Sequence, residues 1–437
     1  MPPVTSMVDA DRYWEADIEC LPRAELDALQ EEKLGELLPW AYERAPLIRD
    51  AWDRAGVTPD AIDSMDAFRD QVPYIDKDAM RHFRDDRGDP YGGMLAIDLA
   101  TPGVFGAIFS TSGTTGDPTL APFAGREGPT ILAREFWELG VRPGDAFVEM
   151  LFTYRGPAIH WTMRGIGATP VFVDHDPAEL PRLIELSRQF QPTGWYNLSG
   201  PLVIALEQLA ESGVDIGSAF ASYRGIVYAG EPLGPRARRL VDSWGLELFD
   251  HTGVGDVGAA TECREHNGCH VWEDTAIIEV LDPDGDEPVA DGERGELVST
   301  TLMNLVSPLV RYRSDDLVRF TREPCACGRT HGRVWPMGRK SDEVVVDGRS
   351  VLPIDVWPAI EDVPETAAGL FQIVRTARDL DRLRLRVGYA RLAPDLRGRV
   401  EDAVEALLGV RPDVELVEQA VLLRQGPPHK IPRVVKQ

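Results

Sequence analysis

The chain has 437 residues with a net charge of −26, and 43% of its residues are hydrophobic. This length exceeds what one ordinary hydrophobic core organises, so two or more domains are expected. The negative charge argues against nucleic acid and against an anionic membrane as partners, because both bind clustered Lys and Arg. No apolar run approaches the ~20 residues that span a bilayer, and the first residues lack the pattern of a secretory signal. We therefore expect a soluble, cytoplasmic protein.

The first part of the chain is expected to be helical and then to enter a polar loop. Apolar residues recur at helical spacing over 25–44, which predicts an amphipathic helix that ends or kinks at Pro39. Residues 105–109 predict a strand that leads into Ser110-Thr111-Ser112-Gly113-Thr114-Thr115-Gly116-Asp117-Pro118. Hydroxyl and backbone N–H groups crowd this loop, and a polyphosphate is the ligand that requires them. No Gly-Lys-Ser/Thr closes it as in a Walker A loop, and a flexible turn is the alternative.

Strands then alternate with helices, which favours an α/β architecture with largely parallel sheets. The expected elements are a helix at 129–138, strands at 146–151 and 169–173, a helix at 181–190 and a buried strand at 225–228. The last strand runs into Ala229-Gly230-Glu231-Pro232, where a flat ligand could approach the backbone at the glycine. An ordinary strand-to-helix turn is the alternative interpretation.

The pattern changes again near residue 276. Strands with Asp-Gly turns predict a β-rich subdomain over about 276–337, and a small α+β domain follows. Its expected elements are a strand at 343–346, a turn at 347–348, a helix around 354–360, a strand at 383–387 and a helix at 395–408. The sequence thus predicts an α/β fold with a large N-terminal domain of mostly parallel sheets, residues 1–337, and a small mobile α+β C-terminal domain, residues 338–437.

Three charged residues stand in positions that suit nucleotide chemistry. Asp256 lies among glycines and could hold Mg²⁺, which takes one or two carboxylates together with phosphate oxygens. Asp316 ends the Arg311–Asp316 segment after an apolar strand, where a carboxylate can accept two hydrogen bonds from a ribose diol. Lys430 lies in a proline-framed loop near the C-terminus. Solvated turns for the two carboxylates and a surface lysine are the alternatives.

In this order the segments resemble the adenylate-forming superfamily of acyl-CoA synthetases, peptide-synthetase adenylation domains and luciferases, and within it the phenylacetate-CoA ligase branch. The resemblance runs from the helix near Leu34 to Lys430. The segments that carry it are Ser110–Pro118, Ala229–Pro232, Arg311–Asp316, Cys325–His331 and Gly338–Asp342.

The resemblance implies a two-step reaction. In this family a carboxylate attacks the α-phosphate of MgATP to give an acyl-adenylate, and a thiol, usually coenzyme A, then displaces AMP. Lys430 would bridge the carboxylate and the α-phosphate, Asp256 would take the place of a Mg²⁺-binding glutamate, and Asp342 would be the hinge of the C-terminal domain. The implied nucleotide contacts are Ser110, Thr111, Ser112, Gly113, Thr114, Thr115, Gly116, Gly230, Glu231, Pro232, Thr252, Gly253, Asp316 and Arg339.

The cysteines gain an interpretation from the same resemblance. Five cysteines in a chain of this size do not indicate a disulfide scaffold. Cys325 and Cys327, with Cys263 and either His270 or Cys269, can supply four ligands to a tetrahedral Zn²⁺, as the Cys/His set of related branch members does. Such a closed site would be structural. Reduced cysteines that only pack are the alternative.

The sequence also departs from the branch. The usual Tyr-Gly-x-Ser/Thr-Glu reads Thr252-Gly253-Val254-Gly255-Asp256, so the adenine-stacking tyrosine and the hydroxyl before the carboxylate are absent. Larger side chains replace a glycine-rich stretch of the acid pocket. The residues expected to contact the acid are Tyr154, Arg155, Gly156, Pro157 and His160. Arg155 could pair with a second anionic or phenolic group, so we expect a small aromatic or similarly compact acid rather than a fatty acid.

Three functions stay open at this stage. An acid–CoA ligase is the first, and the second is an adenylating enzyme whose acceptor is a carrier protein, an amine or a cofactor. The third is a degenerate nucleotide-binding regulatory protein, which Lys430 disfavours and the changes at Thr252 and Gly255 favour. The expected partners are a small-molecule acid and a thiol acceptor, and a homodimer is left open.

Overall fold

The computed structural model describes residues 11–100, 106–110, 120–124, 129–151, 156–426 and 430–436. The chain divides into two compact units, each built from several stretches of sequence. The first unit contains Met1–Pro143, Thr153–Ala168 and His251–Trp335, and the second contains Gly144–Phe152, Thr169–Asp250 and Pro336–Gln437. Neither unit follows the predicted boundary at 337/338, which stays a prediction. Among the described residues, no helix has both the length and the apolar character that a membrane span requires.

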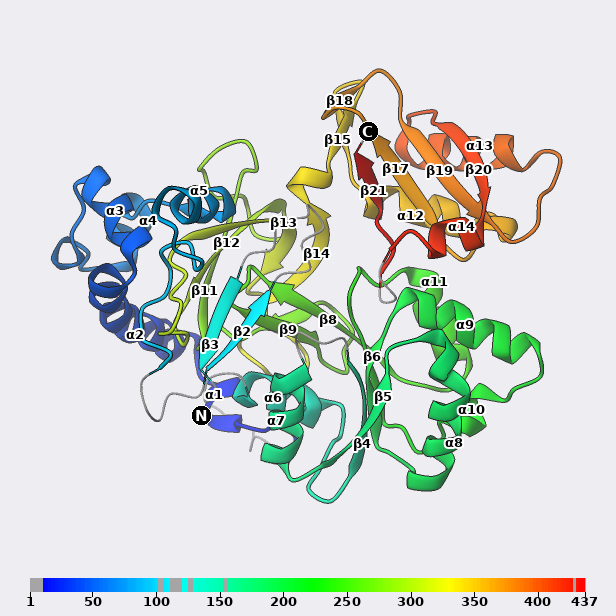
Figure 1. Ribbon diagram of the computed structural model, residues 1–437, viewed down its shortest axis with the longest axis horizontal. Coiled ribbons are helices and arrows are strands. Elements are labelled where there is room, and N and C mark those ends of the chain that lie inside the picture. The colour runs from blue at the N-terminus through cyan, green and yellow to red at the C-terminus, as the bar shows by residue number, and fades with distance from the viewer. Residues whose placement is uncertain are drawn as a thin grey trace, which may run out of the picture. The chain divides into compact units, whose positions relative to one another are not determined.

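A parallel sheet organises one part of the second unit. Its strands run in the order β7-β6-β4-β5, and residues 248–250 of β8 pair with β7. The strands are β4 (Ala146–Leu151), β5 (Thr169–Asp174), β6 (Gly194–Leu198), β7 (Gly225–Tyr228) and β8 (Leu248–Val254). Helices α8 (Leu180–Phe190), α9 (Gly200–Glu211), α10 (Ile216–Ala219) and α11 (Pro235–Ser243) cover one face of this sheet (Figure 1). Their apolar side chains pack on Val148, Trp195 and Ile226, which confirms the predicted α/β architecture.

The rest of the second unit is an α+β layer near the C-terminus. Its sheet has the order β20-β19-β17-β21, made of β17 (Phe371–Arg375), β19 (Arg384–Tyr389), β20 (Asp413–Glu418) and β21 (Val434–Lys436). Helices α12 (Pro353–Glu361) and α13 (Leu396–Leu408) cover one face, where Val356 and Val400 meet Phe371 and Leu385 (Figure 1). Smaller elements complete the layer: β15 (Val344–Val346), β16 (Arg349–Val351), β18 (Asp379–Leu380) and α14 (Gln419–Leu423).

Helices begin the first unit. They are α1 (Ala16–Glu19), α2 (Arg23–Arg44), α3 (Pro46–Ala55), α4 (Met65–Gln71) and α5 (Lys77–Arg87). Leu37 and Ile48 pack with Ile277 and Tyr312 of the neighbouring strands. Helix α2 continues through Pro39 to Arg44, so an end at Pro39 is wrong, and the alternative of a kink there stays a prediction. Leu38 and Ala41 are buried on either side of the proline, so tertiary packing outweighs the local preference.

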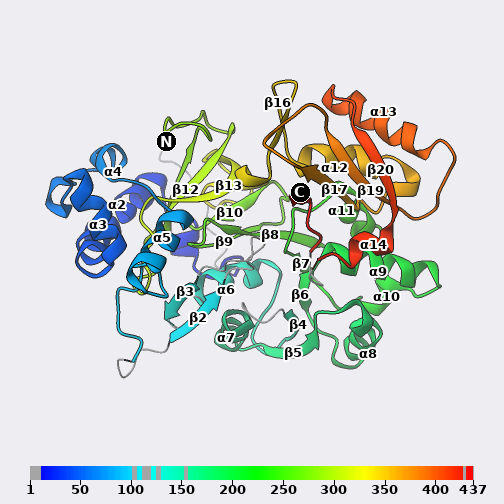
Figure 2. The ribbon, with the colours of Figure 1, turned by 45° about the horizontal axis from the view of Figure 1, so that its top comes forward.

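An antiparallel sheet of order β11-β12-β13-β14-β10-β9-β8 forms the body of the first unit, and residues 251–254 of β8 pair with β9. Its other strands are β9 (Gly258–Glu262), β10 (Cys269–Val271), β11 (Ala276–Leu281), β12 (Arg294–Thr301), β13 (Tyr312–Thr321) and β14 (Arg333–Arg339). The β-rich content expected after residue 276 is confirmed. Further elements are β1 (Ile75–Asp76) beside β13, the antiparallel pair β2 (Gly106–Ser110) and β3 (Leu120–Ala124), and the adjacent helices α6 (Pro129–Glu138) and α7 (Gly156–Ile166), seen in Figure 2.

Candidate active site

The carboxyl edge of the parallel sheet positions Glu231. Parallel strands end at the same edge, and open α/β sheets bind ligands there. Gly230 follows β7 with φ +106°, which turns the chain so that the Glu231 carboxylate lies 3.5 Å from the Tyr228 hydroxyl. A Cβ at Gly200, the first residue of α9, would collide with this carboxylate, so the glycine is required by the close approach.

Glu231 does not present a bare charge at this edge. Arg433 donates to its Oε2 from Nη2 at 2.9 Å and from Nε at 3.1 Å. The two side chains are 9% and 4% exposed, so the ion pair is largely desolvated. The expectation that Glu231 borders adenine stays a prediction, and the structure adds the pairing of its carboxylate with Arg433.

Lys430 lies in the same unit among other charged residues of the predicted site. Burial lowers the pKa of the Lys430 ammonium and the Arg339 guanidinium lowers it further, whereas Asp342 and Glu231 act in the opposite direction. Asp342 is part of a short 3₁₀ turn, Lys340–Asp342, directly after β14. The structure therefore brings Lys430, Arg339, Asp342 and Glu231 within electrostatic reach of one another.

Asp256 and Asp316 lie together in the first unit. Asp256 has φ +58°, and its Oδ2 is 3.2 Å from Lys77 Nζ and accepts a hydrogen bond from the Tyr312 hydroxyl at 3.1 Å. The pKa of Tyr312 is raised, first by burial and then by Asp256, with a smaller contribution from Asp316. Asp256 thus contacts the buried Tyr312 phenol and is partly neutralised by Lys77, and Asp316 lies within electrostatic reach of the same phenol.

The altered segment before Asp256 has a steric reason. Gly255 has φ +49°, and Ser299 on β12 donates from Oγ to its carbonyl at 2.9 Å. A Cβ at residue 255 would meet that same hydroxyl oxygen, so the serine or threonine of the resembling family does not fit here without a shift. Thr252 donates from Oγ1 to the Gly253 carbonyl at 3.2 Å.

Arg311 anchors the segment that carries Asp316. Its guanidinium is 2.9 Å from Glu279 Oε1, and it also donates to the Val72 carbonyl and to the Tyr74 hydroxyl, both at 2.8 Å. The side chains of Arg311 and Glu279 are 4% and 7% exposed. Arg311 therefore has a structural role at the start of β13.

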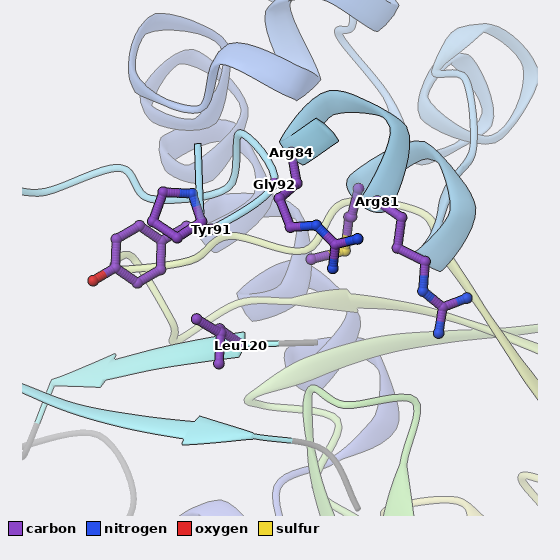
Figure 3. A pocket seen from close by; sticks show the side chains of 7 residues that line it. Arg81, Arg84, Tyr91, Gly92 and Leu120 are labelled. Atoms are coloured by element: carbon purple, nitrogen blue, oxygen red, sulfur yellow. The ribbon is translucent and has the colours of Figure 1, made fainter. Parts of the chain in front are cut away.

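Several predicted site residues have no described side chain. Thr111, Ser112, Gly113, Thr114, Thr115, Gly116, Tyr154 and Arg155 lie outside the described residues. Ser110 ends β2, Gly156 and Pro157 begin α7, and His160 lies within α7. A hollow of about 10 Å³ lies between α5, residues 90–92 and Leu120 of β3 (Figure 3), and it offers room for roughly one water molecule. None of the predicted site residues lines it.

Four of the predicted metal ligands converge in the first unit. Cys263 follows β9, His270 lies on β10, and Cys325 and Cys327 lie between β13 and β14. All four are buried, and their ligand atoms lie within 4.8 Å of one another. Cys263 Sγ is 3.8 Å from Cys325 Sγ, and Cys327 Sγ is 3.3 Å from His270 Nε2. Cys269, the alternative ligand, packs instead with apolar residues of the sheet.

This donor set fits zinc. Thiolates about 2.3 Å from a tetrahedral Zn²⁺ lie roughly 3.8 Å apart, which is the separation of Cys263 and Cys325. The second ring nitrogen of His270, Nδ1, is 3.1 Å from the His331 carbonyl, a contact that fixes the ring with Nε2 toward the cluster. The Arg329 N–H donates to Cys327 Sγ at 3.4 Å, as expected beside a thiolate.

The amino-terminal segment docks on this cluster, a feature that the sequence did not predict. The Tyr13 hydroxyl donates to the Cys327 carbonyl at 2.5 Å. Arg329 pairs with Glu19 at 2.8 Å, and both side chains are buried. Thr330 donates from Oγ1 to the Leu21 carbonyl at 2.6 Å. The Cys325–His331 loop therefore contacts residues 13–21 and also carries two of the four ligands, Cys325 and Cys327.

Glu149 is a second feature that the sequence interpretation missed. It lies on β4, its side chain is fully buried, and neither carboxylate oxygen meets a hydrogen-bond partner among the described residues. Burial raises the pKa of Glu149 to about 8. A single acidic residue inside the apolar run Ala146–Leu151 was the local signal that could have identified it.

An α/β sheet with Gly230 and Glu231 at its carboxyl edge, and Lys430 in the α+β layer near the C-terminus, is the arrangement expected for the adenylate-forming superfamily that the sequence resembles. No family model matches the chain. The phenylacetate-coenzyme A ligase of Thermus thermophilus is 32% identical over 388 residues, which cover 86% of this chain and 84% of the relative. The corresponding ligase of Aromatoleum evansii is 29% identical, with coverage of 85% and 84%.

A solved structure agrees over the whole length. The 2-hydroxyisobutyryl-CoA ligase in its postadenylation state is 25% identical and superposes with a TM-score of 0.85, covering 100% of this chain and 94% of that one. The chain belongs to the phenylacetate-CoA ligase family, whose members are AMP-forming acid–CoA ligases.

Proposed function

We propose that this protein activates a compact carboxylic acid with ATP and transfers the acyl group to coenzyme A. The observation that carries the proposal is the similarity to phenylacetate-CoA ligases, 28–32% identical over 75–86% of the chain. A carboxylate oxygen of the acid attacks the α-phosphorus of ATP and pyrophosphate leaves. The coenzyme A sulfur then attacks the acyl carbon, and AMP leaves with the bonding electron pair.

The proposed roles follow the motifs. Lys430 bridges the acid carboxylate and the α-phosphate, and its lowered pKa reflects the burial such a contact needs. Asp256 binds Mg²⁺, Asp316 accepts the ribose hydroxyls, and Asp342 is the hinge of a mobile domain that begins near residue 338. The Ser110–Gly116 loop holds the phosphates, and Gly230, Pro232, Thr252, Gly253 and Arg339 complete the nucleotide site.

The proposed acid is small. Larger side chains than the branch usually has stand at Tyr154 and Arg155, and His160 follows on α7. The relatives support a compact substrate, since their names refer to phenylacetate and to 2-hydroxyisobutyrate. We assign zinc a structural role, because the Cys263, His270, Cys325 and Cys327 set supplies four ligands and leaves no open position for a substrate. The homodimer and the cytoplasmic location stay predictions from the sequence.

The test is product analysis with ATP, Mg²⁺, coenzyme A and a panel of acids. We expect pyrophosphate and an acyl-CoA from phenylacetate or substituted benzoates and none from palmitate. Lys430→Ala is expected to lose acid-dependent ATP–pyrophosphate exchange, whereas the exposed Lys436→Ala is expected to keep it. An acyl-adenylate without acyl-CoA would indicate a different acceptor, and nucleotide binding without turnover of any acid would refute the enzymatic function.

A further inference from the structure

Two contacts fix the residues that directly follow Lys430. Ile431 is 3% exposed and packs with Leu370, Leu422 and Ile204, the last of which lies on α9. Two residues further on, Arg433 forms the buried ion pair with Glu231. The position of Lys430 relative to Glu231 and α9 therefore depends on one apolar contact and one ionic contact.

The site around Arg433 requires an arginine. Its guanidinium lies 3.7 Å from the centre of the Trp357 ring and also donates to the Gly369 carbonyl. Stacking on an aromatic face while donating in the plane of the group is possible for a planar guanidinium and not for an ammonium. Trp357 is on α12, so the ion pair joins α12, β21 and the Glu231 turn.

A second contact reinforces the first. Glu361, one turn beyond Trp357 on α12, accepts from the Arg236 backbone N–H at the start of α11 at 2.8 Å and from Trp357 Nε1 at 2.8 Å. A Cβ at Gly234 would lie 2.6 Å from Glu361 Oε1 and 3.0 Å from Trp357 Nε1, so the two surfaces are in direct contact. Trp357 thus links both contacts, because it stacks on Arg433 and donates to Glu361.

We propose that Glu231 and Arg433, with Trp357 and Glu361, form a latch that holds Lys430 at the carboxyl edge for adenylation and opens before thiol transfer. The inference rests on the proposed function and assigns Arg433 and Glu231 as positioning residues, not as nucleotide contacts. The latch can open reversibly, because its charged groups regain hydration when they separate and only one small apolar cluster is uncovered. A larger apolar contact would hold the lysine in place through both half-reactions.

The first experiment does not depend on catalysis. Hydrogen exchange of the full chain is followed by mass spectrometry in peptides covering 232–240 and 353–361. Arg433→Gln is expected to accelerate exchange in both by at least about tenfold, since a buried charge-assisted contact is lost. Arg411→Gln is the matched control, because Arg411 is half-exposed in the same C-terminal layer and pairs with Asp402 and Glu405. Exchange in Arg433→Gln that equals the control would overturn the latch.

The second experiment separates positioning from nucleotide binding. Glu231→Arg and Arg433→Glu are each expected to slow acid-dependent ATP–pyrophosphate exchange by about 10- to 100-fold, while acyl-CoA formation from a supplied acyl-adenylate is kept. The double charge reversal is expected to recover part of the exchange rate. A raised KM for ATP in Glu231→Gln without recovery in the double variant would show that Glu231 contacts the nucleotide. If the unaltered protein shows no acid-dependent ATP–pyrophosphate exchange, the proposed function is refuted. The hydrogen-exchange experiment would still test the latch in that case.

Discussion

Replacing Cys327 by serine is expected to remove zinc from the protein and to loosen its amino-terminal segment. Cys327 Sγ lies 3.3 Å from His270 Nε2, and its carbonyl accepts from Tyr13, so the same residue holds the metal set and the docked segment. Cys269→Ser is the matched control. Cys269 is equally buried, precedes His270 on β10 and lies outside the ligand cluster.

The size of the effect follows from metal linkage. A ligand present at about 1,000 times its dissociation constant stabilises the folded state by about 4 kcal/mol if the unfolded chain does not bind it. In a domain of about 150–250 residues, each kcal/mol of lost stability lowers Tm by roughly 2–4 °C. The loss of zinc is therefore expected to lower Tm by on the order of 10 °C. Arg329 lies in the Cys325–His331 loop and pairs with Glu19. If this pair is released, the backbone amides of residues 11–24 are expected to exchange hydrogen faster.

The measurement combines metal content with unfolding. Zinc per chain is determined by elemental analysis after extensive dialysis, and Tm and hydrogen exchange are recorded for both variants. We expect about one zinc in the unaltered protein and in Cys269→Ser, and far less in Cys327→Ser. The reasoning is refuted if Cys327→Ser keeps its zinc. It is also refuted if Cys327→Ser has lost the metal but unfolds at the same Tm as Cys269→Ser.

Two further substitutions test buried charges. Burial raises the pKa of Glu149 from 4.5 to about 8. Between these pH values the folded state keeps a proton on Glu149 that the unfolded state loses. The free energy of unfolding therefore falls as pH rises, by at most about 1.4 kcal/mol per pH unit. Glu149→Gln is expected to remove this dependence, and thermal unfolding of the variant and the unaltered protein from pH 5 to 8 checks it. If Tm changes with pH in the same way in both proteins, the prediction is wrong. Arg311→Met leaves Glu279 buried without its cation, which is expected to cost about 3–5 kcal/mol. Adding Glu279→Gln is expected to recover part of the lost Tm, and an unchanged Tm in Arg311→Met would contradict the anchoring role.

The elements that the sequence predicted well are those set by local periodicity. The helix at 129–138 and the strands at 146–151 and 225–228 have the predicted bounds, because their apolar spacing is decided within a few residues. Pro39 shows the limit of local rules. Its effect on the helix is opposed by the burial of Leu38 and Ala41 against other elements, which no local window contains.

The site residues likewise divide into those that the sequence could identify and those whose partners only the fold reveals. The Cys263–Cys325 contact joins residues 62 positions apart, and the Glu231–Arg433 pair joins residues 202 positions apart. The cysteine set was predicted from the resemblance to the Cys/His set of related branch members, and the structure brings four of its residues together. No comparable rule pairs one acid with one arginine among the 72 acidic and 46 basic residues of the chain. The partner of Glu231 therefore had to come from the fold.

The Asp256 carboxylate gives a last prediction about the metal of the nucleotide. Its Oδ2 already contacts Lys77 Nζ at 3.2 Å, so Mg²⁺ bound by Asp256 as proposed would compete with an ammonium for the same oxygen. The side chains are 25% and 39% exposed, and such a pair is worth at most about 1 kcal/mol, or roughly a fivefold change in affinity. Lys77→Gln is therefore expected to lower the half-saturating Mg²⁺ concentration for acid-dependent ATP–pyrophosphate exchange by up to about fivefold. Lys33→Gln removes the same charge elsewhere in the first unit and is expected to leave that concentration unchanged. If Lys77→Gln raised the half-saturating Mg²⁺ concentration instead, the prediction would be wrong. Lys77 would then neutralise phosphate charge beside the metal, and it would contact Asp256 only while no nucleotide is bound.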